Sequence, residues 1–347
     1  MPFKILIHEY FTGGGWSEPD MPPDIASEGL AMLYAVVDDF RKWGKATVFS
    51  TLDKRLSGIP INADNITITD PEEYDENISK SVRQCDFALI IAPESDGILA
   101  SLNEQMKDNG ATLIGCDQEA IRRTGDKWEC HKVLSNAGIP VPETIVETDL
   151  KPLSTSRYNA LENAQKIGFP LVIKPVDGVG CEGVHLIKDM NTLRTVLEYD
   201  SSYANGLLLQ EYVKGEHLSV SLLTTGKEFV LLSLNRQYIE EGMPFKYSGG
   251  EIMSPPDTSD ILHNIIKKVL EIIPGLKGYT GIDLIRSEAG YKIIEINPRL
   301  TTSYAGIRQV INLNLAEAMF DAVINNKLPE SFKIKNKKIF SKEMLID

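Results

Sequence analysis

The segment that most constrains the fold of this chain is residues 281–299, GIDLIRSEAGYKIIEINPR. Apolar strands flank a turn at Ser287–Gly290, so a hairpin is expected that places Asp283 roughly opposite Glu295. Side chains alternate along a strand, so Glu295 and Asn297 share one face. Two unpaired carboxylates among apolar neighbours are costly, and a hard cation such as Mg²⁺ would relieve their repulsion. The segment predicts a metal site; an exposed edge hairpin is the alternative.

The first 115 residues alternate strand and helix signals. The apolar strands are expected in KILIHEY, ATVFST, DFALIIAP and ATLIG. Between the first two strands, apolar residues recur at helical spacing from Leu30 to Phe40, and Gly44 ends that helix. Such alternation predicts a parallel sheet covered by helices, with ligands near the carboxyl ends of the strands.

From residue 116 the pattern changes. One helix is expected over 118–137, closed by Gly138, and short strands and hairpins follow it. From 278 onwards the sequence favours antiparallel strands backed by helices. The expected fold is therefore mixed α/β (α+β). Its expected parts are a parallel α/β domain at 1–115, a central subdomain at 116–209, a C-terminal subdomain at 210–330 and a peripheral tail at 331–347.

Charge and composition exclude several functional classes. The chain has 36 Lys and Arg against 49 Asp and Glu, a net charge of -13, whereas proteins that bind nucleic acid usually carry the opposite bias. No apolar run approaches the roughly 18 residues that a membrane-spanning helix needs. The opening residues MPFKILIHEY are expected to form a strand and not a signal peptide. We therefore expect a cytoplasmic protein with no membrane or nucleic-acid partner.

A lysine followed by a glycine-rich loop is the first phosphate-binding candidate. Lys174 ends the apolar strand LVIKP, and DGVGCEG follows with Gly178, Gly180 and Gly183. Backbone N–H groups of such a loop can approach phosphate oxygens closely. The pattern is neither a P-loop nor a dinucleotide fingerprint. A lysine that extends from a strand end into solvent and a plain flexible turn are the alternatives.

The string LLLQEYVKGEH is a candidate nucleotide-contacting strand. Backbone groups of Gln210, Glu211, Tyr212 and Val213 could meet the edge of an adenine, and Glu216 could accept hydrogen bonds from ribose hydroxyls. Alone, the string is an ordinary strand end.

The order of these features resembles the ATP-grasp superfamily of carboxylate–amine ligases over roughly residues 115–325. The resemblance implies that Lys127 and Lys174 hold the ATP phosphates and that the 178–183 loop closes over them. It further implies that Glu211 and Val213 meet adenine. Two Mg²⁺ ions, for which Mn²⁺ could substitute, would lie on Asp283, Glu295 and Asn297.

The resemblance also implies a chemistry. In this superfamily ATP phosphorylates a carboxylate, and an amine attacks the resulting acyl phosphate. Cations must surround the transferring phosphoryl group and the tetrahedral oxyanion. Arg299 is the first candidate for that role, followed by Arg236 and Lys246, for which surface salt bridges are the alternative. Ser303, just past the metal strand, could hydrogen-bond substrate.

Substrate specificity is expected in the first domain. The loop HEYFTGGG follows the first strand, so Glu9, Thr12, Gly13 and Gly14 could meet an amino-acid head group; a tight structural turn is the alternative. The first 40 residues resemble the tyramine–glutamate ligases of methanofuran biosynthesis. That narrower resemblance implies glutamate as the acid and tyramine as the amine.

Other functions stay open at this point. Lysine–ornithine ligases share most of these motifs, and a nucleotide-binding regulatory protein could keep the fold without turnover. A nicotinamide-dependent dehydrogenase is disfavoured because no G-x-G-x-x-G opens the first helix. The expected partners are small-molecule substrates, and the resemblance allows a homodimer.

Overall fold

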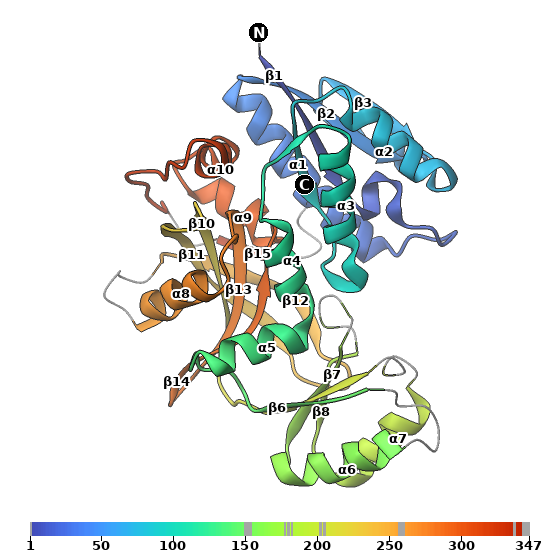
Figure 1. Cartoon of the computed structure of the whole chain (residues 1–347), viewed down its shortest axis with the longest axis vertical. Helices are drawn as coiled ribbons and strands as arrows, with labels where there is room; N and C mark the ends of the chain where they lie inside the picture. Colours follow the sequence, from blue (N-terminus) through green and yellow to red (C-terminus); the bar gives the residue numbers. More distant parts are fainter. Residues whose placement is uncertain are drawn as a thin grey trace.

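The chain folds around three β-sheets, as Figure 1 shows. The computed structural model describes residues 2–148, 155–176, 178, 181, 183–200, 203, 206–255, 261–335 and 338–341. A parallel sheet forms the N-terminal part, and two antiparallel sheets follow it. The predicted mixed α/β class is confirmed. Within the described residues, no helix is both long and apolar enough to cross a bilayer.

The parallel sheet has the strand order β3-β2-β1-β4-β5. Its strands are β1 (Phe3–Glu9), β2 (Ala46–Asp53), β3 (Asn65–Thr69), β4 (Phe87–Ile91) and β5 (Thr112–Leu113). Its helices are α1 (Pro23–Trp43), α2 (Tyr74–Val82) and α3 (Ile98–Asp108). Gly44 ends α1 as predicted: it takes a left-handed conformation (φ 73°) and its N–H donates to the Phe40 carbonyl.

The small sheet has the order β6-β9-β7-β8 and all its pairings are antiparallel. Its elements are β6 (Thr144–Glu147), α6 (Thr155–Ile167), β7 (Leu171–Pro175), β8 (His185–Ile187), α7 (Met190–Tyr199) and β9 (Leu207–Glu211). A separate apolar cluster, which includes Ala160, Ile173 and Leu209, fills the space between this sheet and its helices. Because β9 runs to Glu211, the expected boundary at 209/210 falls inside a strand of this sheet.

The large sheet has the order β14-β13-β10-β11-β12-β15. Its strands are β10 (Glu216–Thr224), β11 (Phe229–Glu240), β12 (Lys246–Met253), β13 (Gly278–Ser287), β14 (Gly290–Asn297) and β15 (Lys338–Ser341). Its helices are α8 (Ile261–Ile272), α9 (Ser303–Val310) and α10 (Leu315–Ile324). Within the expected peripheral strand or tail at 331–347, residues 338–341 form the edge strand β15, which pairs with β12 and buries Phe340.

The single helix expected over 118–137 is broken in two. The chain forms α4 (Gln118–Gly125) and α5 (Lys127–Asn136), with Asp126 in an extended conformation between them. The Asp126 carboxylate accepts a hydrogen bond from the Glu129 N–H at 2.8 Å and so caps α5. The apolar spacing continues across the break, which is why periodicity alone misses it. The break makes Lys127 the first residue of a helix.

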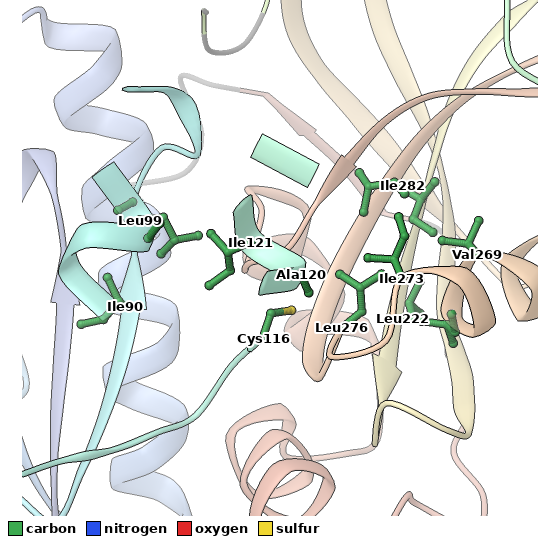
Figure 2. Packing of buried hydrophobic residues seen from close by; sticks show 14 of the residues in the cluster. Ile90, Leu99, Cys116, Ala120, Ile121, Leu222, Val269, Ile273, Leu276 and Ile282 are labelled. Atoms are coloured by element: carbon green, nitrogen blue, oxygen red, sulfur yellow. The ribbon is translucent and has the colours of Figure 1, made fainter. Parts of the chain in front are cut away.

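Helix α4 joins the first domain to the large sheet. Figure 2 shows Ile121 and Ala120 of α4 between Leu99 of α3 on one side and Ile282 of β13 on the other, and all four belong to one buried cluster. A core that is continuous across two sheets resists relative motion, since parting them would expose apolar surface to water.

A buried polar contact closes a second junction between these parts. The Tyr304 hydroxyl of α9 donates to Asp39 of α1 at 2.9 Å, and Arg308 Nε donates to the same carboxylate at 2.9 Å. Burial raises the pKa of Asp39, and the Arg308 guanidinium opposes that shift.

We predict that Asp39→Ala lowers the free energy of unfolding by about 3 kcal/mol, because it removes the carboxylate that Arg308 and Tyr304 face in a buried setting. Urea unfolding measures the change. The exposed Glu119, paired with Arg123 one helical turn away, supplies the control Glu119→Ala, for which we expect a loss below about 0.5 kcal/mol. Equal losses in the two variants would contradict the assignment.

Candidate active site

A cavity of about 790 Å³ is lined by residues of all three sheets. Sites for small ligands are commonly about 300–1,000 Å³ in volume. The parallel sheet contributes Glu9 and Glu94, which lie at or just beyond the carboxyl ends of β1 and β4. The small sheet contributes Lys174, and the large sheet contributes Asp283 and Glu295. The cavity therefore lies at the edge of the parallel sheet where ligands were expected.

The predicted hairpin with its facing carboxylates is confirmed. Strands β13 and β14 pair antiparallel, with Asp283 opposite Glu295 and the turn closed between Ser287 and Gly290. Asn297 Nδ2 donates to Asp283 Oδ2 at 3.2 Å. Gln237 of β11 donates from Nε2 to the other oxygen, Oδ1, at 3.0 Å. Sequence reasoning missed Gln237, because only the pairing of β10 with both β11 and β13 brings it to Asp283.

These carboxyl groups suit a hard cation. Burial, followed by the nearby charge of Glu295, raises the pKa of Asp283 from 3.8 to about 7. A divalent cation would favour the ionised form of both groups, and the carboxylate and amide oxygens are the donors that Mg²⁺ prefers. Among the described residues, no three His, Cys, Asp or Glu side chains are grouped to hold a metal. An ion bound here would therefore take further ligands from elsewhere, such as phosphate oxygens.

Lys127 connects the glycine loop to the carboxylates. Its Nζ donates to the Gly178 carbonyl at 2.6 Å and lies 3.6 Å from Glu295 Oε1. The break before α5 gives this lysine its position at the start of the helix. The predicted phosphate-binding lysine thus lies beside the predicted metal ligand and the predicted phosphate loop.

Lys174 lies on β7 with only 6% of its surface exposed. Burial lowers its pKa to about 8, although the Glu295 carboxylate opposes the shift. Among the described residues, no carboxylate forms an ion pair with this buried ammonium, so it is prepared to receive an anion. Of the loop glycines, Gly178 accepts from Lys127 and Gly183 accepts from the Tyr203 hydroxyl at 2.5 Å, whereas Gly180 lies outside the described residues.

The predicted adenine-contacting strand borders the cavity, which Gln210, Glu211, Tyr212 and Val213 all line. The Gln210 side chain donates to Thr144 Oγ1 at 2.9 Å. Both carboxylate oxygens of Glu211 accept from Lys292 Nζ, at 2.7 and 2.9 Å. Gln210 pairs with strands on both sides of β9, and the Glu211 N–H donates to the Glu143 carbonyl at 2.8 Å. The Glu211 carbonyl and the two following residues therefore stay the candidates for contact with a base.

Glu216 lies apart from its predicted role. Its carboxylate pairs with Arg236 and with Arg286, whereas the next residue, His217, lines the cavity. His217 Nε2 lies 2.8 Å from Glu241 Oε1.

Strand register explains this difference. Ser219 of β10 pairs with Asp283, and both residues belong to the cavity face of the sheet. Side chains on one face of a strand recur every second residue, so His217 shares this face with Ser219 and Glu216 lies on the other face. The alternation of residues along the strand predicts a period of two but not which of the two faces turns toward the cavity.

The three predicted cations lie in different settings. The Arg299 side chain is 18% exposed; its Nη2 donates to Glu94 Oε2 at 3.0 Å, and its Nε lies 2.9 Å from Glu94 Oε1. Arg236 lines the cavity but also pairs with Glu251 at 3.1 Å, in keeping with its salt-bridge alternative. Lys246 is exposed at the rim of the cavity.

The loop after β1 is largely a structural turn. Glu9 lines the cavity, but its Oε2 accepts from both the N–H and the hydroxyl of Thr12, at 2.8 and 2.7 Å. Gly13 leaves no room for a side chain, since a Cβ there would lie 2.6 Å from the His8 ring. Gly14 has a φ of 101°, which favours glycine. The turn thus explains Thr12, Gly13 and Gly14 by packing.

Ser303 belongs to a buried hydroxyl cluster at the start of α9. Its Oγ lies 3.0 Å from Ser221 Oγ, 3.0 Å from the Tyr279 hydroxyl and 2.8 Å from Thr301 Oγ1. Ser303 and Thr301 line the cavity, so this cluster forms part of its wall.

Comparison with known proteins gives consistent matches over nearly the whole chain. Residues 124–303 match the family described as "ATP-grasp domain", and residues 46–121 match the "pre ATP-grasp 3 domain". The chain is 31% identical over 339 residues to a tyramine–L-glutamate ligase of Methanocaldococcus jannaschii, which covers 96% of this chain and 93% of that protein. The corresponding ligase of Methanocaldococcus fervens is also 31% identical, over 96% of this chain and 98% of that protein.

Among solved structures, an ATP-grasp superfamily protein from Archaeoglobus fulgidus superposes with a TM-score of 0.65 at 25% identity. The match covers 91% of this chain and 87% of that one.

We predict that Asp283→Asn stabilises the protein in the absence of nucleotide and metal. Between about pH 4 and pH 7 the folded state binds one more proton at Asp283 than the unfolded state, so this group lowers stability as pH rises. An amide carries no such cost, and we expect a gain of about 2–4 kcal/mol at pH 8 that disappears near pH 4. Urea unfolding across this pH range measures it. The exposed Glu330→Gln serves as control, and a gain independent of pH would contradict the raised pKa.

Proposed function

The chain belongs to the ATP-grasp family, and from this membership we propose that it joins L-glutamate to tyramine through an amide bond. It is an ATP-dependent carboxylate–amine ligase. The two relatives that share 31% identity over 96% of the chain support these two substrates. The observation that carries the proposal is the cavity in which Lys127, Lys174 and Arg299 face Asp283 and Glu295.

The first step activates the acid. A glutamate carboxylate oxygen attacks the γ-phosphorus of ATP, the bond to the β,γ-bridging oxygen breaks, and ADP leaves with that electron pair. We assign Lys127 and Lys174 to the phosphates, because one borders the glycine loop and the other is a buried ammonium beside it. Bound Mg²⁺ would neutralise phosphate charge, and Asp283, Glu295 and Asn297 are the residues that would hold it.

The second step forms the amide. The amine nitrogen attacks the acyl carbon and forms a tetrahedral oxyanion, which collapses as phosphate leaves with the bonding electrons; the nitrogen loses its extra proton. Phosphate is a far better leaving group than the oxygen of a free carboxylate, which is the reason for the first step. Arg299 is assigned to the negative charge that develops on the transferring group and on the oxyanion.

Finer details of the proposal follow from the same assignment. Two Mg²⁺ ions, replaceable by Mn²⁺, would lie at Asp283, Glu295 and Asn297, and Val213 with the backbone of Glu211 would meet adenine. The amide would serve methanofuran biosynthesis in the cytoplasm. Gln210 and Tyr212 border the base in this arrangement, and a homodimer stays a prediction.

We expect phosphate release from Mg·ATP to require glutamate and to rise further with tyramine. A panel of amino acids, each tested alone and with a set of amines that includes tyramine, lysine and ornithine, measures this, and mass spectrometry identifies the amide. Selection of another acid and amine would contradict the substrates and leave the ligase class in place. No release with any pair, despite ATP binding in the same samples, would favour a nucleotide-binding regulator.

We expect Lys174→Ala and Glu295→Ala each to lower kcat by about 100-fold or more, because each removes a charge that is positioned for the transferring phosphoryl group. Steady-state kinetics measures the loss, and circular dichroism checks that the variants are folded. The exposed Lys188, just beyond β8, supplies the matched control Lys188→Ala, which should keep wild-type kcat. Wild-type activity in either site variant would contradict its assigned role.

A further inference from the structure

Glu94 brings a charge from the first domain to the predicted catalytic arginine. It follows β4, and 205 residues separate it in sequence from Arg299. The two side chains are only 10% and 18% exposed. Arg299 Nη2 donates to Glu94 Oε2 at 3.0 Å, whereas Nε and Glu94 Oε1 approach to 2.9 Å without forming a hydrogen bond. One charge-assisted hydrogen bond within a largely buried ion pair restricts where the guanidinium can lie.

The hydrogen bonds of Arg299 show which of its N–H groups stay available to a ligand. A guanidinium has five N–H groups. One N–H of Nη2 donates to Glu94 Oε2, and one of Nη1 donates to the Leu300 carbonyl at 3.1 Å. Among the described residues, the Nε–H and one N–H on each of Nη1 and Nη2 are left beyond these two hydrogen bonds, and Arg299 lines the cavity beside Asp283 and Glu295. The contact thus anchors the cation and leaves donors for a ligand.

A competing carboxylate makes the anchor necessary. Besides Glu94, the carboxylates of Glu295 and Glu9 exert an electrostatic attraction on Arg299. Without Glu94 these attractions would act unopposed on the arginine, and Lys127 already approaches Glu295 to 3.6 Å. An arginine drawn to Glu295 would leave the position where phosphoryl charge develops and would neutralise a group assigned to another role.

The segment that carries Glu94 is held from several sides. Asp96 and Gly97 both take left-handed conformations (φ 55° and 68°), which turn the chain sharply between β4 and α3. Gly125 at the end of α4 packs against Glu94 so closely that a Cβ there would lie 3.1 Å from the Glu94 carbonyl oxygen. A well-held carboxylate can restrict its partner, whereas a mobile one cannot.

We propose that Glu94 is a positioning residue that holds Arg299 in its catalytic orientation, so that the first domain takes part in the phosphoryl-transfer step. This inference rests on the proposed function, because it gives Arg299 the role described above. It also assigns the first domain a part in the chemistry that is separate from substrate specificity.

A double-mutant cycle on kcat tests the proposal with Glu94→Gln, Arg299→Ala and the combined variant. Gln is chosen because its amide oxygen still accepts from Arg299 while the negative charge is lost. We expect Glu94→Gln alone to lower kcat by about 10- to 100-fold, with the KM for ATP changed by less than about threefold. In the Arg299→Ala background the same substitution should cost less than about threefold, because a residue that acts through Arg299 has nothing left to position.

Controls separate positioning from stability and from the choice of substrates. Glu104, whose carboxylate lies 3.7 Å from Arg122 on the surface, gives the matched control Glu104→Gln with wild-type kcat expected. If Glu94→Gln lowers Tm strongly, Glu94→Asp retains the charge pair, shifts the carboxylate by one methylene, and should show an intermediate kcat. Losses that multiply in the double variant, or a wild-type kcat in Glu94→Gln, would overturn the proposal.

The wild-type rate with glutamate and tyramine is measured first. Its absence would contradict the proposed substrates alone, and the cycle would then be run with the acid and amine that the panel selects.

Discussion

The structure depends on the compensation of charges that are held away from water. Moving an isolated ionised group into a protein interior costs several kcal/mol or more, so each buried charge here has an opposite charge or several donors close by. Arg299 faces Glu94, Lys127 approaches Glu295, and Arg308 faces Asp39. Two described groups are exceptions. Lys174 is buried on β7 without an ion pair to another described residue. Asp283 stands beside Glu295 with amide donors from Asn297 and Gln237, and burial together with the charge of Glu295 raises its pKa to about 7. The excess of negative charge at Asp283 and Glu295 is what makes these two residues a candidate cation site.

The three sheets that line the cavity do not share one hydrophobic core. One apolar cluster runs from α3 through α4 to β13, so the parallel sheet and the large sheet share a core (Figure 2). The small sheet packs around a cluster of its own. Among the described residues, the ion pair between Glu211 and Lys292 and two backbone hydrogen bonds, from Leu186 to Gly242 and from Phe245 to Val184, link it to the large sheet. Asp283 and Glu295 thus belong to a sheet with a shared core, whereas Lys174 belongs to a sheet that packs separately. This arrangement suits a site that must admit and then enclose ATP.

Two segments of the first domain border the cavity, and they differ in what they contribute to it. The turn after β1 is filled by its own hydrogen bonds and close packing, which explains its glycines without any ligand. The segment after β4, in contrast, extends a carboxylate to a cation of the large sheet. The first loop, where specificity is expected, lies at the edge of the parallel sheet that borders the cavity, while the ion pair with the cation of the large sheet comes from a different loop.

Features that depend on local pattern can be predicted from the amino-acid sequence. Periodicity and turn chemistry over short distances predict the alternation of strands and helices before residue 115, the Gly44 helix end, the hairpin at 281–297 and the facing of Asp283 and Glu295. Other features arise only when distant segments pack together. Strand register and contacts between distant segments account for four features: the break at Asp126, the presence of His217 and not Glu216 in the cavity, the approach of Gln237 to Asp283, and the pairing of Glu94 with Arg299. Alternation along one strand fixes a period, but only the packing of neighbouring strands decides which face is buried.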